Sequence, residues 1–264
     1  MATRTKKGAN REGKMSLGQH LVELRKRLFR AAAGIILGSI FGFIVSEYVV
    51  DVMRAPILQL AADQGRAASL NFTDVTGAFD LRMQIAITVG FVVSSPVWLY
   101  QIWAFLVPGL TKRERGYSVG FLGAAIPLFL MGCYAGLLVV PHIIELLTGF
   151  ASAQDSAIIS AREYYDFILK LVIAVGIAFV VPVFVVLLNF VGVISAATII
   201  KSWRIAILVI VLFTAIATPA ADVVSMFLLA IPMIILYFAA YGVAYLHDRR
   251  AAKAAARLET ELAA

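Results

Sequence analysis

The chain has 264 residues, of which 61% are hydrophobic and only 15% charged, and its formal net charge is +7 at pH 7. Soluble domains contain about 45–50% apolar and about 25% charged residues, so this composition excludes an ordinary soluble domain and predicts a membrane protein with several spanning helices. The single cysteine, Cys133, excludes a disulfide framework and a cysteine-based metal site. Its apolar neighbours predict a small buried side chain.

The N-terminal 30 residues are rich in cations, with nine lysines and arginines. Residues 1–15 are polar and basic, which predicts a disordered segment. Residues 16–30 are amphipathic and predict a helix at the membrane interface that leads into the first span. The leucines of this stretch recur at helical spacing: Leu17, Leu21, Leu24 and Leu28.

Six apolar stretches predict six membrane-spanning helices. The fifth and sixth are expected to be short, since crossing the hydrocarbon core takes about 20 residues. Four stretches contain an internal proline (Pro96, Pro127, Pro182 or Pro232), which removes one helical hydrogen bond and bends the helix. The predicted fold class is therefore an all-α integral membrane protein with these spans: 29–50, 81–107, 118–140, 166–191, 202–217 and 223–245.

Two long and three short connections join the spans. Residues 51–80 and 142–165 are predicted to be mixed loops, and Pro141 is predicted to end the third span. The polar, alanine-rich tail after residue 245 is predicted to be helical. The chain is thus expected to divide into a disordered N-terminus, a six-span membrane domain and a C-terminal tail, at residues 1–15, 16–245 and 246–264.

The lysines and arginines predict the orientation. Eighteen of the 23 fall in residues 1–30, in the segments 108–117 and 192–204, and in the tail. The positive-inside rule places these segments in the cytoplasm. Both termini are then cytoplasmic, which agrees with an even number of spans. The net charge needs no nucleic acid partner to explain it.

Several sequence motifs follow one another along this six-span frame. They are HLVELRKRL at residues 20–28, Ala55-Pro56, SPVWLYQIWAFLVPGL at 95–110, KRER at 112–115, Val181-Pro182-Val183, TPAAD at 218–222 and LAIPM at 229–233. In this order, they resemble the TatC family, the multispanning subunit of the twin-arginine protein translocase.

This resemblance implies a function in protein export. The chain is expected to bind the twin-arginine signal peptides of folded proteins at its cytoplasmic face. Its expected partners are the single-span subunits TatB and TatA, other copies of itself and the lipid bilayer of the cell membrane. Transport in this family draws on the proton-motive force, so neither an enzymatic activity nor a cofactor is expected. The sequence agrees, since it contains no P-loop motif for a nucleotide.

A ligand with paired arginines needs carboxylates, because guanidinium groups bind them in a bidentate manner. Outside the termini, the acids of the predicted cytoplasmic face are Glu23 and Glu114. The residues alone favour a plainer interpretation, in which each acid pairs with neighbouring arginines. The resemblance favours the two glutamates as acceptors for the signal peptide.

The resemblance assigns roles to further residues. Arg25 and Phe105 are expected to contact the signal peptide, although a charge that sets orientation and an interfacial aromatic explain them as well. Residues expected to shape the site or the assembly are Leu24, Pro56, Pro108, Gly109, Leu110 and Arg115. Without the family, the residues from 108 to 110 are ordinary turn formers.

Two positions stay open or depart from the family. Asp222 is interpreted either as an assembly residue or as the N-cap of the last span, and the sequence favours neither. Val180 stands where many family members carry Glu or Gln, two residues before Pro182. A polar contact with a partner helix is therefore not expected there.

Two other classes of protein compete with this interpretation. A secondary transporter would show internal repeats and charges at mid-membrane, but no repeat is evident and most charges lie at span ends. A membrane enzyme would gather reactive groups in one pocket. The histidines His20, His142 and His247 fall on different sides of the predicted membrane, which argues against it.

Overall fold

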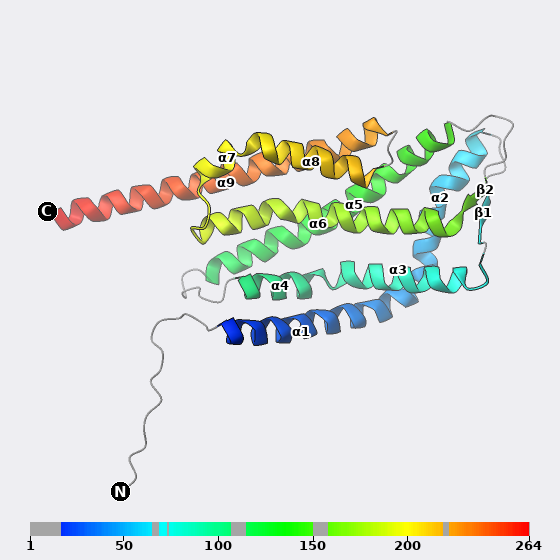
Figure 1. Cartoon of the computed structure of the whole chain (residues 1–264), viewed down its shortest axis with the longest axis horizontal. Coiled ribbons are helices and arrows are strands. Elements are labelled where there is room, and N and C mark those ends of the chain that lie inside the picture. Colours follow the sequence, from blue (N-terminus) through cyan, green and yellow to red (C-terminus); the bar gives the residue numbers. More distant parts are fainter. Residues whose placement is uncertain are drawn as a thin grey trace, which may run out of the picture.

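The structure, a computed structural model, describes residues 17–64, 69–72, 74–106, 115–149, 158–218 and 222–263. Helices dominate this part of the chain (Figure 1). In chain order the elements are α1 (Leu17–Ile44), α2 (Ser46–Gln64), β1 (Ser69–Asn71), α3 (Gly77–Val93), α4 (Ser95–Leu106), α5 (Arg115–Gly149), β2 (Ile158–Ser160), α6 (Ala161–Phe190), α7 (Ala196–Lys201), α8 (Trp203–Ala217) and α9 (Val223–Ala263).

The main helices run alternately between two ends of the molecule (Figure 1). The start of α1, the end of α4, the start of α5, helix α7 and the end of α9 lie at one end, which we call the basic end. The opposite end holds β1 and β2, and we call it the strand end. The start of α1 and the end of α9 thus share one end, as an even number of passes requires.

Four of the described helices, α1, α5, α6 and α9, are long and apolar enough to cross a membrane. Helices α3 and α4 reach that length only as a pair, bent by 57°. Helix α8 has 15 residues, so the prediction of a short fifth span is confirmed. Helix α9 has 41 residues because it continues without a break from the sixth apolar stretch into the tail, so the prediction of a helical tail is confirmed.

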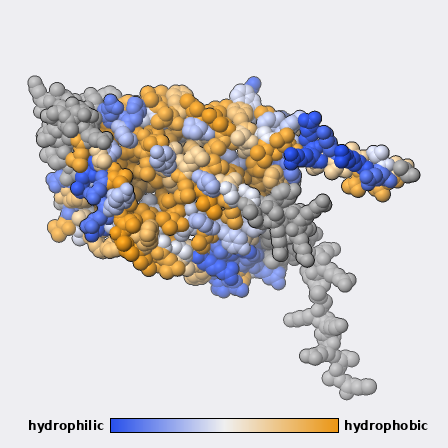
Figure 2. All heavy atoms as spheres, turned by 180° about the vertical axis from the view of Figure 1, so that it is seen from behind, coloured by the Kyte–Doolittle hydropathy of each residue, from blue (hydrophilic) through white to orange (hydrophobic). Residues whose placement is uncertain are grey.

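The face of the bundle in Figure 2 is apolar between its two ends. Large hydrophobic side chains are exposed on several helices, among them Leu37 of α1 at 68%, and Leu208 and Ile216 of α8 at 66% and 76%. Such a surface is unfavourable in water and is matched by lipid hydrocarbon. The described part of the chain is therefore a multi-pass membrane protein with four or five long candidate spans.

The first long loop was predicted wrongly, because residues 46–64 form helix α2. Met53 and Ile57, four residues apart, are buried and give α2 an apolar face. The hydroxyl of Tyr164 on α6 donates a hydrogen bond of 2.7 Å to the Met53 carbonyl and fixes α2 against the bundle. The all-α prediction also missed a small parallel pairing of β1 with β2, in which Leu70 lies opposite Ile159.

The prolines behave in two ways. Pro127, Pro182 and Pro232 lie inside helices, as predicted. Pro141 does not end the third span, since α5 continues to Gly149 and so occupies the start of the second predicted loop. One missing backbone donor is tolerated there because buried residues lie on both sides of it, Val139 and Val140 before and Ile143 and Ile144 after.

The second predicted span is broken rather than bent around an internal proline. The break lies at Ser94, so Pro96 is the second residue of α4. Proline has no backbone N–H to donate and is tolerated in the first turn of a helix, which favours a new helix beginning just before Pro96. The Trp98 indole donates a hydrogen bond of 2.9 Å to the Phe91 carbonyl, which the break leaves without its usual helical donor.

Small residues bring α1 and α3 into close contact. A Cβ atom added to Gly38 would lie 2.6 Å from the Gly90 carbonyl oxygen, and one added to Gly42 would collide with the Ala86 carbonyl. Gly34, Gly38 and Gly42 recur every four residues, the small-residue spacing that lets membrane helices approach closely. This spacing was readable in the sequence but formed no part of the prediction.

A carboxylate joins α9 to α6 and α7 at the basic end, just beyond the apolar stretch of α9. Asp248 accepts hydrogen bonds from the Ala196 backbone N–H (2.8 Å) and from the buried Asn189 amide (2.9 Å). The pKa of Asp248 is lowered from its ordinary value of 3.8, chiefly by the Ala196 hydrogen bond, with Asn189 and His247 adding to the effect. The predicted connection between the fourth and fifth spans, residues 192–201, contains the short helix α7.

We expect the thermal stability of the Asp248→Asn variant to depend less on pH in the acid range than that of the wild type. A carboxylate with a lowered folded pKa stabilises the fold above its ordinary pKa, and that contribution is lost as the pH falls through the folded pKa. The measurement is the apparent melting temperature of the purified protein in detergent from about pH 6 to about pH 3. Glu259→Gln, an exposed acid on the same helix, is the control and should keep the wild-type profile. Equal profiles for the two variants would contradict the expectation.

Candidate functional site

The candidate site lies at the basic end, on the first turns of α1. Glu23 and Arg27 are one helical turn apart and form an ion pair in which each side chain is only 20% exposed. Arg27 Nε donates a hydrogen bond of 2.9 Å to Glu23 Oε1. The other carboxylate oxygen, Oε2, is shielded from solvent and has no hydrogen-bond partner among the described residues. One acceptor of Glu23 is therefore engaged and the other is unused.

A groove of about 440 Å³ runs beside Glu23 along α1. The described residues that line it are Gln19, Val22, Glu23, Lys26, Arg27 and Arg30. Glu23 is the single acid in this set, against three cations. An unused carboxylate oxygen in such a setting favours a cationic ligand that brings its own donors, because leaving a buried acceptor unpaired costs about 1–3 kcal/mol.

A ring contact positions the end of α4 beside this site. His20 and Phe105 stack with their centroids 4.3 Å apart and their planes inclined by 15°. His20 lies three residues before Glu23 and so on a neighbouring face of α1. The structure thus brings together two predicted site residues, Glu23 and Phe105. His20, which belongs to the same sequence motif as Glu23, connects them.

The other predicted residues of the basic end divide into three groups. Arg25 and Leu24 are exposed on α1, and Leu24 is 40% exposed. Arg115 is the first residue of α5, but its side chain lies outside what the structure describes. The remaining ones, Pro108, Gly109, Leu110 and Glu114, lie outside the described residues altogether.

Pro56 and Asp222 lie away from this site. Pro56 is inside α2 and partly buried next to Ile57. Asp222 is 2% exposed, and its Oδ1 accepts a hydrogen bond of 2.8 Å from the Ser225 backbone N–H. Asp222 therefore caps the first turn of α9, which supports the capping interpretation without testing a role in assembly. Its Oδ2 has no hydrogen-bond partner in the described part of the chain.

Asp222→Ala and Asp222→Asn should separate the two roles of this residue. The alanine variant loses the cap and should be less stable by about 1 kcal/mol, whereas asparagine keeps an acceptor and should melt close to the wild type. The measurement is thermal unfolding in detergent, followed by co-purification with the single-span partners. If Asp222→Asn melts normally but no longer retains partners, the carboxylate acts in assembly; if it retains them, capping suffices.

Val180 is buried at 3% exposure, so the position that departs from the family pattern packs inside the bundle. A polar cluster exists elsewhere between α3 and α6. The Gln84 amide donates a hydrogen bond of 2.6 Å to the Asp166 carboxylate. Asp166 also forms an ion pair of 2.6 Å with Lys170. Among the described residues, no group of three His, Cys, Asp or Glu side chains is suited to hold a metal.

Fold and site together define a multi-pass helical membrane protein with a charged surface at one end. The family model described as "Sec-independent protein translocase protein (TatC)" matches residues 19–232. The chain belongs to the TatC family, and it is a subunit of the twin-arginine translocase rather than an enzyme.

Relatives and solved structures cover nearly the whole chain. TatC of Xylanimonas cellulosilytica is 41% identical over 241 residues, which is 91% of this chain and 87% of that protein. TatCy of Bacillus subtilis is 29% identical over 244 residues, 92% of this chain and 93% of that protein. A crystal structure of the twin-arginine translocase receptor TatC matches with a TM-score of 0.71 and 32% identity, covering 86% of this chain and 98% of its own. The same receptor in DDM matches with a TM-score of 0.73 and 31% identity, over 85% of this chain and 99% of its own.

Proposed function

We propose that this chain is the receptor subunit that binds twin-arginine signal peptides of folded proteins at its basic end. It lies in the cell membrane with six spans, α8 being the shortest, and with both termini in the cytoplasm. With TatB and TatA type partners and other copies of itself, it mediates export driven by the proton-motive force.

The observation that carries the proposal is the unused Oε2 of Glu23. An arginine of the signal peptide donates to this oxygen and removes the cost of leaving it unpaired. Two arginines in sequence need two acceptors, and Glu114 supplies the second. Glu114 directly precedes Arg115, the first residue of α5, and α5 starts at the basic end of the bundle.

The hydrophobic part of a signal peptide needs an apolar contact next to the arginine acceptors. Phe105 provides it, since its ring is partly exposed and is held by His20. Arg25 is exposed on α1, two residues after Glu23 and therefore on another face of the helix, and it donates to backbone carbonyls of the peptide. Leu24, Pro108, Gly109, Leu110 and Arg115 keep the two acceptors in place, and Pro56 has a structural role within α2.

Site-specific photocross-linking tests this function. A photoreactive residue at Glu114 or at Phe105 should cross-link to an Arg-Arg signal peptide and much less to a Lys-Lys peptide. The control position is Tyr48, which is 73% exposed in the first turn of α2, the helix that follows α1. Equal adducts from Tyr48, or equal adducts with both peptides, would refute the proposal.

A further inference from the structure

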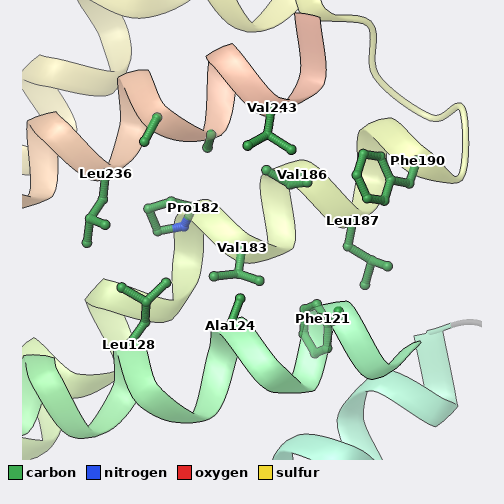
Figure 3. Close-up of a pocket in the computed structure, with 13 residues that line it drawn as sticks. Phe121, Ala124, Leu128, Pro182, Val183, Val186, Leu187, Phe190, Leu236 and Val243 are labelled. Carbon is green, nitrogen blue, oxygen red and sulfur yellow. The ribbon is translucent and has the colours of Figure 1, made fainter. Parts of the chain in front are cut away.

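An apolar groove lies between α5, α6 and α9 and is separate from the site at Glu23. It encloses about 340 Å³. Figure 3 shows the side chains that converge on it, with Phe121 and Phe190 toward one end and Leu128 and Leu236 toward the other. Every residue that lines it is apolar, so its occupant must be a hydrocarbon.

The groove exists partly because several of the residues that line it are glycine or alanine, whose side chains fill little volume. Gly120 and Ala124 on α5 line the groove, as do Ala239 and Ala240 on α9. A Cβ atom added to Gly120 would meet no other atom within 4 Å. Ala239 and Val243 are exposed, so the groove opens on the outer surface of the bundle, where lipid lies. A hydrocarbon chain therefore has access from the side.

The end of the groove near the basic end carries positive charge. Phe190, which lines the groove, contacts His247 with ring centroids 4.5 Å apart. Val243, His247 and Arg250 are four and three residues apart on the continuous helix α9, so they share one face. Arg250 is exposed and forms no ion pair with any described residue. The neighbouring Asp248 is already engaged by α6 and α7.

We propose that this groove binds one acyl chain of an anionic phospholipid, whose phosphate contacts Arg250. Arg250 follows Val243 by about 10 Å along the helix axis, which places its charge at headgroup level while the chain lies in the groove. A partner helix does not fit as the occupant, because a helix with its side chains is about 10–12 Å wide and exceeds the enclosed space. The positive mouth selects an anionic over a zwitterionic lipid.

Lipid retention measured by native mass spectrometry tests this site. The full chain in detergent is mixed with phosphatidylglycerol or with phosphatidylcholine of the same acyl chains. We expect the wild type to retain phosphatidylglycerol about fivefold more strongly, the effect of one arginine at an anionic headgroup. Arg250→Glu should remove this preference, and Gly120→Leu should reduce retention of both lipids by filling the groove.

Two variants serve as matched controls. Arg249→Glu makes the same charge change on another face of α9, and Gly123→Leu adds the same side chain on α5 at a glycine that also has open space but does not line the groove. Both should retain lipid like the wild type. Unchanged retention in Gly120→Leu, or loss in the controls equal to that in the test variants, would overturn the proposal. So would a photoreactive residue at Gly120 that cross-links to a polypeptide in membranes instead of to lipid.

Discussion

Replacing Glu23 with lysine is expected to abolish the preference of this chain for an Arg-Arg over a Lys-Lys signal peptide. Hydrogen bonds to charged groups contribute about 1.5–3 kcal/mol, so the loss in affinity should be between about tenfold and a hundredfold. Lysine adds repulsion from the peptide's own arginines in a groove that already holds Lys26, Arg27 and Arg30. Glu114→Lys should weaken binding of the same peptide. The measurement is fluorescence anisotropy of labelled peptides on the purified protein.

The matched control is Glu47→Lys. Glu47 also pairs with an arginine, Arg82, but lies in the first turn of α2, and its side chain is 77% exposed. Reversing the charge of Glu47 should leave the affinity for the Arg-Arg peptide unchanged. If Glu23→Lys and Glu47→Lys bind the Arg-Arg peptide equally well, Glu23 is not an acceptor.

A third variant examines the competition between the protein's own arginine and the ligand. Arg27 occupies Oε1 of Glu23 in this structure. Arg27→Gln leaves the carboxylate without its charged partner, so an incoming guanidinium gains more by binding it. Affinity for the Arg-Arg peptide should then rise, and a fall would mean that Arg27 positions Glu23 for the ligand instead of blocking it.

The sequence predicted most of the long helices because their apolar runs are long and uninterrupted. It failed where tertiary packing outweighs a local signal. Proline disfavours the interior of a helix, yet α5 continues through Pro141 because the residues on both sides of it are buried in the bundle. Residues 51–64 mix polar and apolar side chains and were predicted as part of a loop, although they belong to α2 and Met53 and Ile57 give them a packed helical face.

The candidate site, too, was predicted in part by the sequence and depends in part on tertiary packing. Motif residues identified Glu23 and Phe105, but spacing along the chain gives no sign that His20 stacks on Phe105, since they belong to different helices. The pairing of Glu23 with Arg27 agrees with the plainer interpretation of that acid. The unpaired Oε2 is a property of three-dimensional packing, and no sequence pattern reports it.

Gly38→Leu is expected to have the largest effect on stability, because it forces α1 away from α3. The added Cβ would lie 2.6 Å from the Gly90 carbonyl oxygen and 3.1 Å from the Gly90 Cα, and backbone atoms cannot rotate aside as a side chain does. Overpacking of this kind costs about 3 kcal/mol or more, which lowers the melting temperature of a chain this size by roughly 6–12 °C. The measurement is thermal unfolding in detergent, with Gly38→Ala expected to show an intermediate loss.

Gly18→Leu on the same helix provides the contrast, since a Cβ at Gly18 meets nothing within 4 Å. It should be neutral or slightly stabilising, because leucine favours the helix over glycine. The consequence of Gly38→Leu should also reach the basic end, since α1 carries both Glu23 and His20. Separation of α1 from the α3–α4 pair breaks the His20–Phe105 stack, so peptide binding should fall together with stability. A Gly38→Leu protein that melts like Gly18→Leu would show that the close approach of α1 and α3 does not hold the bundle together.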